Sequence, residues 1–172
     1  RIKEQIIEYY ETSSHEINER IKIGKPRILF FTSYFTITLK YHTRDCRKVA
    51  QKMRLETELL NEEKPIFVIS YSHIFKKVNQ FRPDIIFCID HFRFEGIFWP
   101  KQIVWITWIQ DMLPYVVDAN TPAKLGKRDF IMNHFTTWRE FRKIGYQQSN
   151  LIEAPIPASS DIYKVYNLTK EE

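Results

Sequence analysis

Glycine is rare in this sequence, which has only 4 among 172 residues. No G-x-G-x-x-G pattern is present to support a dinucleotide cofactor, and no G-x-x-x-x-G-K-[ST] pattern indicates a loop for a nucleoside triphosphate. The G-x-S-x-G pattern of a hydrolase nucleophile is missing as well. We therefore expect no cofactor, and few places where the backbone comes close to a phosphate.

Cysteine and long apolar runs are also scarce. Cys46 and Cys88 lie far apart in predicted helix and strand cores, and we interpret them as reduced packing residues of a cytoplasmic protein. No closely spaced group of Cys and His indicates zinc, so we expect no bound metal. No apolar run approaches the roughly 20 residues of a membrane span, and the polar N-terminus shows no signal-peptide segment.

Charge of one sign is not concentrated anywhere in the chain. The net charge of +5 comes from basic residues scattered among acidic ones, without an arginine-rich block. This balance fits an anionic ligand or a peripheral contact with an acidic membrane surface, and by itself it does not argue for nucleic acid.

The most informative stretch is Ile103 to Pro114, which reads IVWITWIQDMLP. Six of its first seven residues are apolar, which predicts a central strand buried on both faces of a parallel sheet. Gln110 and Asp111 follow where the apolar run stops, and Pro114 prevents the strand from continuing. Ligands bind at the carboxyl ends of such strands, so Asp111 is a candidate for chemistry; the alternative is that it only caps the loop.

Apolar runs alternate with helical patterns along the rest of the chain. Residues 1–23 have the spacing of an amphipathic helix that is interrupted near Ser13 and packs on the edge of the sheet or against a neighbour. A second helix is expected to begin with Thr43 as its N-cap, and to dock through the stripe Cys46, Val49, Ala50 and Met53. Further helices are predicted from residue 72, over 121–126 and over 137–144, and residues 64–69 fit either a short strand or a helix.

Six segments are predicted to be strands, and their arrangement defines the fold class. They are residues 27–32, 55–60, 84–90, 103–109, 129–133 and 151–154. Only about a dozen residues separate the third strand from the fourth, so we expect a single helical turn or an irregular link there. The alternation predicts an α/β fold, a Rossmann-like doubly wound and mainly parallel sheet of about six strands with an extra N-terminal helix.

Polar residues follow several of these strands. Because parallel strands share one carboxyl edge, we expect these residues to gather there: Tyr41, His42, Thr43, Arg44, Asp90, His91, Arg93, Gln110, Asp111 and His134. Each histidine is suited to act as a general base near neutral pH, although polar residues are common in loops in any case. The helix start at Thr43–Arg44 favours an anion. Trp105 and Trp108 either stack on a sugar or base or belong to the core.

Several segments taken in order resemble the N-terminal half of a bacterial GT-B glycosyltransferase of the family 1/family 4-like group. They are KPRILFFTS, YHTRDC, FRPDIIFCIDH, IVWITWIQDMLP, KIGY and LIEAPIPASSDIY, and together they extend from about Lys25 to Tyr166. FRPD and WIQDMLP are the more specific of them. Many relatives carry a glycine-rich loop where this chain has SYFTITLKYHTRD. The resemblance divides the chain into an N-terminal helix at 1–24, a Rossmann-like domain at 25–166 and the start of an interdomain linker at 167–172.

The resemblance implies an enzyme whose C-terminal half binds a nucleotide-sugar donor, while this half holds a glycan, lipid or protein acceptor. The chain begins at Arg1 rather than methionine and ends without a closing element, so we expect a fragment that is inactive alone. His91 and Asp111 are the candidate catalytic residues, and the other eight residues gathered above are expected to bind substrate. Whether transfer inverts or retains configuration stays open.

Two other hypotheses compete with sugar transfer. One is a non-catalytic sensory or interaction domain of the flavodoxin-like receiver type, although Thr32 and Ser33 stand where a receiver has an acidic pair. The other is a degenerate glycosyltransferase-like domain retained for assembly, for which the long N-terminal helix is the best evidence. All the site predictions require His91 and Asp111 to lie at the same edge of the sheet.

Overall fold

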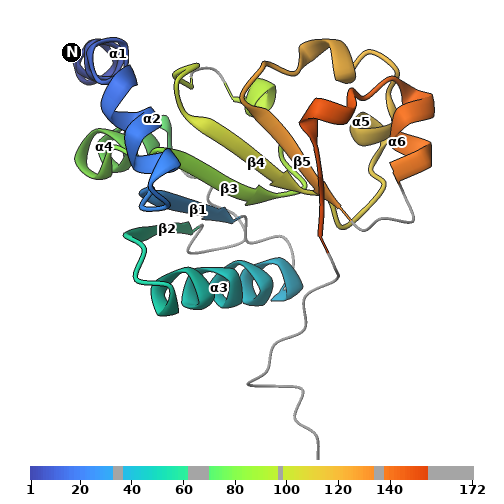
Figure 1. Ribbon diagram of the computed structural model, residues 1–172, viewed down its shortest axis with the longest axis horizontal. Coiled ribbons are helices and arrows are strands. Elements are labelled where there is room, and N and C mark those ends of the chain that lie inside the picture. The colour runs from blue at the N-terminus through green and yellow to red at the C-terminus, as the bar shows by residue number, and fades with distance from the viewer. Residues whose placement is uncertain (33–36, 62–69, 97–98, 134–137, 155–172) are drawn as a thin grey trace, which may run out of the picture.

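The computed structural model of the chain describes residues 1–32, 37–61, 70–96, 99–133 and 138–154. These residues form one sheet of six parallel strands in the order β2-β1-β3-β4-β5-β6 (Figure 1). The strands are β1 Ile28–Thr32, β2 Thr57–Asn61, β3 Ile85–Ile89, β4 Val104–Trp108, β5 Asp129–Asn133 and β6 Leu151–Glu153. The predicted α/β fold with a parallel six-stranded sheet is confirmed, and all six strands lie within two residues of their predicted positions.

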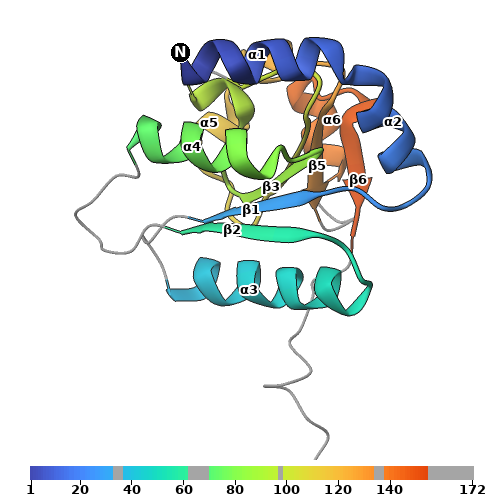
Figure 2. The same ribbon diagram turned by 90° about the vertical axis from the view of Figure 1, so that its left-hand side faces the viewer.

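Helices cover the two faces of the sheet unequally (Figures 1 and 2). They are α1 Ile2–Thr12, α2 Ser14–Lys22, α3 Ile37–Lys52, α4 Tyr71–Phe81, α5 Pro114–Val117 and α6 Trp138–Ile144, with 3-10 turns η1 Arg93–Glu95, η2 Pro122–Lys124 and η4 Gln148–Asn150. Among these helices, only α3 lies on one side of the sheet, which we call the α3 face. The other side, the α4 face, is covered by α1, α2, α4, α5 and α6.

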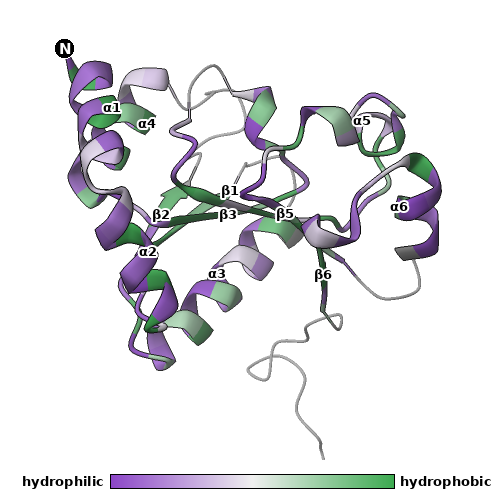
Figure 3. Cartoon of the chain, turned by 45° about the horizontal axis from the view of Figure 1, so that its top comes forward, coloured by the Kyte–Doolittle hydropathy of each residue, from purple (hydrophilic) through white to green (hydrophobic). Residues whose placement is uncertain are grey.

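Strand β4 is central, as the apolar run predicted. It pairs with β3 on one side and with β5 on the other. Trp105 and Thr107 point to the α4 face and are buried, while Trp108 is buried on the α3 face. The strands are coloured mainly as hydrophobic residues in Figure 3, whereas α3 carries both colours. Trp105 and Trp108 therefore belong to the core.

The N-terminal segment forms two helices, with the break at Ser13 that the sequence indicated. It packs on a face of the sheet rather than on its edge, because α1 lies against α4 on the α4 face. Tyr10 donates a hydrogen bond to the carbonyl of Pro83 at 2.7 Å, and the Arg20 guanidinium binds both oxygens of Asp84 at 2.6 and 2.9 Å. This contact attaches the helices to the start of β3.

The helix after β1 differs from the prediction. It begins at Ile37, so Thr43 lies inside α3 and is not its N-cap. Of the predicted docking stripe, Cys46 and Ala50 face the sheet, but Val49 and Met53 are 55% and 67% exposed. The sheet-facing line includes the fully buried Thr43, whose polarity hid the true phase of the helix.

The remaining predictions agree with the structure in kind. The described part of the link between β3 and β4 contains the 3-10 turn η1, and helix α4 buries Ile74 and Val78 as expected. Only a 3-10 turn, η2, forms within residues 121–126, while α5 was not predicted although Pro114 is well suited to a first helical position. Residues 64–69 and the predicted N-cap Thr137 lie outside the described residues.

Candidate functional site

The carboxyl ends of β3 and β4 form the candidate site. Ile89 pairs with Trp108 at the last register position, and Asp90 follows directly. One carboxylate oxygen of Asp90 accepts hydrogen bonds from the backbone N–H groups of Gln110 at 2.7 Å and Asp111 at 3.3 Å. Asp90, His91, Gln110 and Asp111 therefore lie at one edge of the sheet, as the site predictions required.

Asp90 occupies an unusual environment for a carboxylate. Its side chain is 4% exposed, and this burial raises its pKa, while the hydrogen bonds from Gln110 and Asp111 act in the opposite direction. Its φ of 54° lies in the left-handed region, which Asp tolerates better than most residues. Tyr115 in α5 donates a hydrogen bond to the Asp90 carbonyl. The turn after β3 is thus held by contacts from β4 and α5.

His42 approaches the same edge from α3. Its Nδ1 lies 2.8 Å from Nε2 and 3.2 Å from Oε1 of Gln110, and its ring stacks on Trp108 with centroids 5.4 Å apart. When the Gln110 amide oxygen accepts from His42 Nδ1–H, the lone pair on His42 Nε2 is left to accept a proton. When the amide is flipped, Gln110 Nε2 donates to His42 Nδ1, and His42 Nε2 carries the hydrogen and acts as a donor. Gln110 therefore orients His42 and couples it through its backbone to Asp90.

His91 lies on the opposite side of the sheet from His42. Its Nδ1 is 2.9 Å from Glu95 Oε2, and its ring meets the edge of Phe31, which packs on the α4 face. The His91 carbonyl accepts hydrogen bonds from Cys88 and Thr107 at 2.9 and 2.7 Å. The backbone of His91 is therefore anchored on the sheet, and its ring is held by a carboxylate.

Asp111 presents its side chain to solvent at this edge. Its backbone N–H donates to Asp90 and its carbonyl accepts from Leu113 at 2.9 Å, so the backbone is held while the carboxylate is exposed. The backbone contacts of Asp111 agree with the alternative that this residue caps its loop. The exposed carboxylate oxygens can still accept hydrogen bonds from a ligand.

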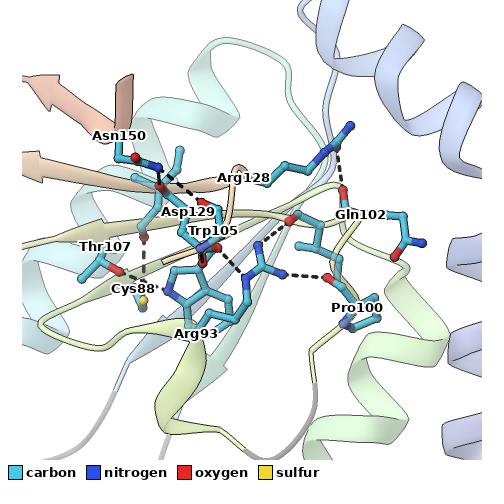
Figure 4. Close-up of polar contacts among 12 residues, drawn as sticks. Cys88, Arg93, Pro100, Gln102, Trp105, Thr107, Arg128, Asp129 and Asn150 are labelled. Carbon is cyan, nitrogen blue, oxygen red and sulfur yellow. Dashed lines mark hydrogen bonds and ion pairs between the residues drawn. The ribbon is translucent and has the colours of Figure 1, made fainter. Parts of the chain in front are cut away.

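The structure does not bring Arg93 to this edge. Its Nε donates to Asp129 at 2.5 Å, and its two terminal nitrogens donate to the carbonyls of Pro100 and Ile103 at 2.7 and 2.6 Å (Figure 4). Asp129 begins β5 and Ile103 precedes β4, so Arg93 reaches the amino edge of the sheet. We therefore remove Arg93 from the candidate site. A neighbouring contact at that edge joins Asn150 to the Asp129 carbonyl.

The other predicted binding residues are separated by helix α3. Tyr41 and Arg44 are exposed on its surface, and Thr43 is fully buried with a hydroxyl oxygen that has no hydrogen-bond partner among the described residues. Because these residues lie inside α3, the predicted anion site at a helix start near Thr43–Arg44 is wrong. His134 lies outside the described residues.

Sequence reasoning missed three contributors to the site. Glu95 follows His91 by four residues, a helical spacing that signals contact, but the helical turn expected as one possibility for this link was not assigned to particular residues. Trp108 was identified as core and also supports the His42 ring. Nothing in the sequence around Tyr115 indicates that its hydroxyl reaches the Asp90 carbonyl.

Among the described residues, no group of three or more His, Cys, Asp or Glu side chains is arranged to hold a metal ion. Within the same part of the chain, no helix combines the length and apolar character needed to cross a membrane. Comparisons of the chain with protein-family models, curated proteins and solved structures found no match. The described residues form an α/β domain with a Rossmann-like, six-stranded parallel sheet.

Proposed function

We propose that this domain is the acceptor-side half of a cytoplasmic glycosyltransferase. Such an enzyme transfers a sugar from a nucleotide-sugar donor to a hydroxyl group of a glycan, lipid or protein. The observation that carries the proposal is the grouping of His42, Asp90 and Gln110–Asp111 at the carboxyl edge of a parallel sheet. Open α/β sheets bind their ligands at that edge.

The groups at this edge suit a ligand that carries many hydroxyls. The Asp111 carboxylate accepts hydrogen bonds, the Gln110 amide both donates and accepts, and the His42 ring does either according to its tautomer. These side chains differ in exposure and are held in place by backbone contacts to Asp90 and by the stack on Trp108. A pre-oriented set of this kind positions an acceptor at low entropic cost.

In this proposal His91 is the general base and Glu95 is its positioning residue. A carboxylate that accepts from Nδ1–H fixes the tautomer in which Nε2 carries the lone pair, and it stabilises the imidazolium that forms. In an inverting transfer, Nε2 takes the acceptor proton as the acceptor oxygen bonds to the anomeric carbon and the nucleoside diphosphate leaves. In a retaining transfer, the same residues only position the acceptor hydroxyl.

A non-catalytic interaction or sensory domain is the alternative function. The observation that favours it is the strand order, because β2-β1-β3-β4-β5 is also the order of flavodoxin-like folds. A domain of this type, or a degenerate glycosyltransferase retained for assembly, would keep the fold without needing an oriented base. Loss of transfer on removal of the base therefore distinguishes the enzyme from both.

The experiment is sugar transfer by the full-length protein that contains this chain, measured as nucleoside diphosphate release over a panel of nucleotide sugars and acceptors. We expect His91→Ala and Asp111→Asn each to abolish transfer while leaving Tm nearly unchanged, because both side chains are partly or fully exposed. His15→Ala, at an exposed position on α2, is the matched control and should transfer normally. Wild-type rates in both site variants would exclude the two residues from the site.

The coding sequence beyond Glu172 provides an independent test. The proposal requires a second Rossmann-like domain there, with an acidic residue that binds the ribose of the nucleotide-sugar. An unrelated domain or a stop codon at that point would refute the enzyme and leave the interaction domain as the better explanation.

A further inference from the structure

Three arginines converge on one tyrosine at the amino edge of the sheet, opposite the candidate site. The Tyr9 hydroxyl oxygen accepts hydrogen bonds from Nη2 of Arg27 at 2.8 Å and from Nη2 of Arg20 at 3.5 Å. The Arg82 guanidinium lies over the Tyr9 ring, with its central carbon 4.3 Å from the ring centroid. Figure 2 shows α1 beside α4, and α2 leading to the start of β1. We call Tyr9 and the three arginines the arginine cluster.

The arginine cluster carries more positive charge than its surroundings balance. Among the described residues, Asp84 is the only carboxylate that forms an ion pair with any of these arginines, and it is fully buried. It lies 2.6 Å from Arg20 Nη2 and 3.9 Å from Arg27 Nε. The carboxyl end of α4 contributes only about half a negative charge nearby. Because arginine is always charged in proteins, the cluster keeps a positive excess that favours an anion.

The arginine cluster also has hydrogen-bond donors to spare. Each guanidinium has five N–H groups. The buried Nε of Arg27 has no hydrogen-bond partner in the described part of the chain, so Asp84 does not satisfy the whole of this guanidinium. The Tyr9 oxygen accepts two hydrogen bonds, but within residues 1–32, 37–61, 70–96, 99–133 and 138–154 no atom accepts its hydroxyl hydrogen. A ligand that binds here must therefore offer several acceptor oxygens.

The residues of the FRPD segment hold the cluster in position. Asp84 accepts from Nε and Nη2 of Arg20 at 2.9 and 2.6 Å and from the backbone N–H of Arg27 at 2.9 Å. Arg82 has a left-handed φ of 51°, which ends α4 just before Pro83. The side chain of Arg82 is exposed, whereas those of Arg20 and Arg27 are 28% and 20% exposed. The cluster is therefore fixed from below and reachable from solvent.

A phosphate group matches these features better than a carboxylate does. A phosphate monoester carries a charge of about −1.5 to −2 at pH 7 and has three strong acceptor oxygens. A carboxylate carries a single charge and has two oxygens. The planar guanidinium suits phosphate because it donates two parallel hydrogen bonds. Contacts to Asp84 and to the Tyr9 ring already restrain the arginine side chains, which lowers the entropic cost of binding.

We propose that Tyr9, Arg20, Arg27 and Arg82 form a binding site for a phosphate group. The Tyr9 hydroxyl donates to one phosphate oxygen, and the guanidinium groups donate to the others. A bound phosphate joins the two N-terminal helices to the start of β1 and to the end of α4. The site lies at the amino edge of the sheet, so this proposal does not depend on sugar transfer at the carboxyl edge.

The test is calorimetric titration of the whole chain with inorganic phosphate and with pyrophosphate, at about 0.15 M ionic strength and pH 7.5. We expect saturable binding by the wild-type chain. Arg82→Ala should weaken it at least ~10-fold, because charge-assisted hydrogen bonds to the phosphate are lost. Tyr9→Phe keeps the ring beneath Arg82 and removes only the hydroxyl, and it should also weaken binding.

Arg54→Ala is the matched control. Arg54 is exposed, follows α3 and has a left-handed φ of 60°, so this variant removes the same charge and introduces the same backbone strain as Arg82→Ala. Since Arg54 contacts no member of the arginine cluster among the printed ring and hydrogen-bond contacts of the described chain, it should bind phosphate as the wild type does. Circular dichroism and Tm should confirm that all variants are folded.

A soluble molecule and a lipid headgroup are both sources of a phosphate group. Sedimentation with phosphatidylcholine vesicles that contain phosphatidic acid distinguishes them. Arg82-dependent binding of pyrophosphate supports a soluble ligand, and Arg82-dependent binding of the vesicles alone supports a lipid headgroup.

Two results would overturn the proposal. One is a folded wild-type chain that binds neither phosphate, pyrophosphate nor the vesicles. The other is an equal loss of binding in Arg82→Ala and Arg54→Ala, because it would show a general attraction of anions to a basic protein.

Discussion

The buried side chain of Asp90 stabilises the turn after β3, and three substitutions separate the effect of its acceptor oxygen from the effects of its charge and its backbone conformation. We expect Asp90→Ala to lower the free energy of unfolding by about 3 kcal/mol, because the N–H groups of Gln110 and Asp111 lose their acceptor at a buried position. Alanine also carries a cost of about 1 kcal/mol at the left-handed φ of 54°. Asp90→Gly lacks that cost and should recover about 1 kcal/mol of the loss.

Asp90→Asn should behave differently. Both N–H groups bind the same carboxylate oxygen, Oδ1, and the amide oxygen of asparagine can replace it. Asparagine also tolerates the left-handed conformation. Burial raises the pKa of Asp90, so the charged carboxylate carries a desolvation cost that the neutral amide of asparagine avoids. We therefore expect Asp90→Asn to keep or increase stability at pH 7.

The pH dependence follows from the same shift. The folded state holds the Asp90 proton to higher pH than the unfolded state, so unfolding releases a proton in this window. The part of the stability that depends on the Asp90 proton is therefore complete below the unfolded pKa of about 4 and decreases as pH rises through the folded pKa. This decrease should be missing in Asp90→Asn.

Urea denaturation between pH 3 and pH 8, with thermal unfolding at pH 7, measures all three variants. For a domain of this size, about 3 kcal/mol corresponds to a fall in Tm of roughly 6–12 °C for Asp90→Ala. Equal losses for Asp90→Asn and Asp90→Ala would refute the reasoning, because they would show that the charge rather than the acceptor oxygen stabilises the turn.

Three further predictions concern contacts away from this turn. Arg20→Ala should lower the free energy of unfolding in urea by about 3 kcal/mol, because it leaves the fully buried Asp84 without its bidentate partner. An unchanged value would show that this ion pair does not stabilise the fold. Arg93→Lys should lower Tm without changing the affinity for the acceptor measured by calorimetry, because Arg93 contacts Asp129 and Ile103 at the amino edge of the sheet. A loss of affinity would show that Arg93 belongs to the binding site. Burial raises the pKa of Cys46 to about 11 and also raises the pKa of Cys88. Both thiols should therefore react with a thiol reagent at pH 8 only after unfolding, and rapid labelling of the folded protein would contradict this.

The predicted site shows where sequence reasoning succeeds and where it stops. It placed Asp90, Gln110 and Asp111 at one edge correctly, because the ends of apolar runs fix where the backbone leaves a parallel sheet. It misplaced Arg93, although the residue lies only three positions after Asp90. A long side chain can extend toward either edge, and the carbonyls of Pro100 and Ile103 that attract it are presented only by the folded chain.

Helix α3 shows the same division. The apolar spacing identified a helix that contains Cys46 and Ala50, but it placed the start at Thr43 and assigned Val49 and Met53 to the interface. A buried threonine looks like a capping residue in the sequence, and an exposed methionine looks like a core residue. Which side of a helix meets the sheet depends on the neighbouring elements, which periodicity does not describe.

The sequence alone determined the alternation of strands and helices, the central position of β4 and the edge at which polar residues gather. Local spacing and chain connectivity set these features, because each strand must bury its apolar faces and parallel strands require crossovers. Only the tertiary structure decided that His42 pairs with Gln110 while His91 pairs with Glu95 on the other side of the sheet. Those pairings depend on distances between segments that lie far apart in the chain, and packing of the whole domain sets those distances.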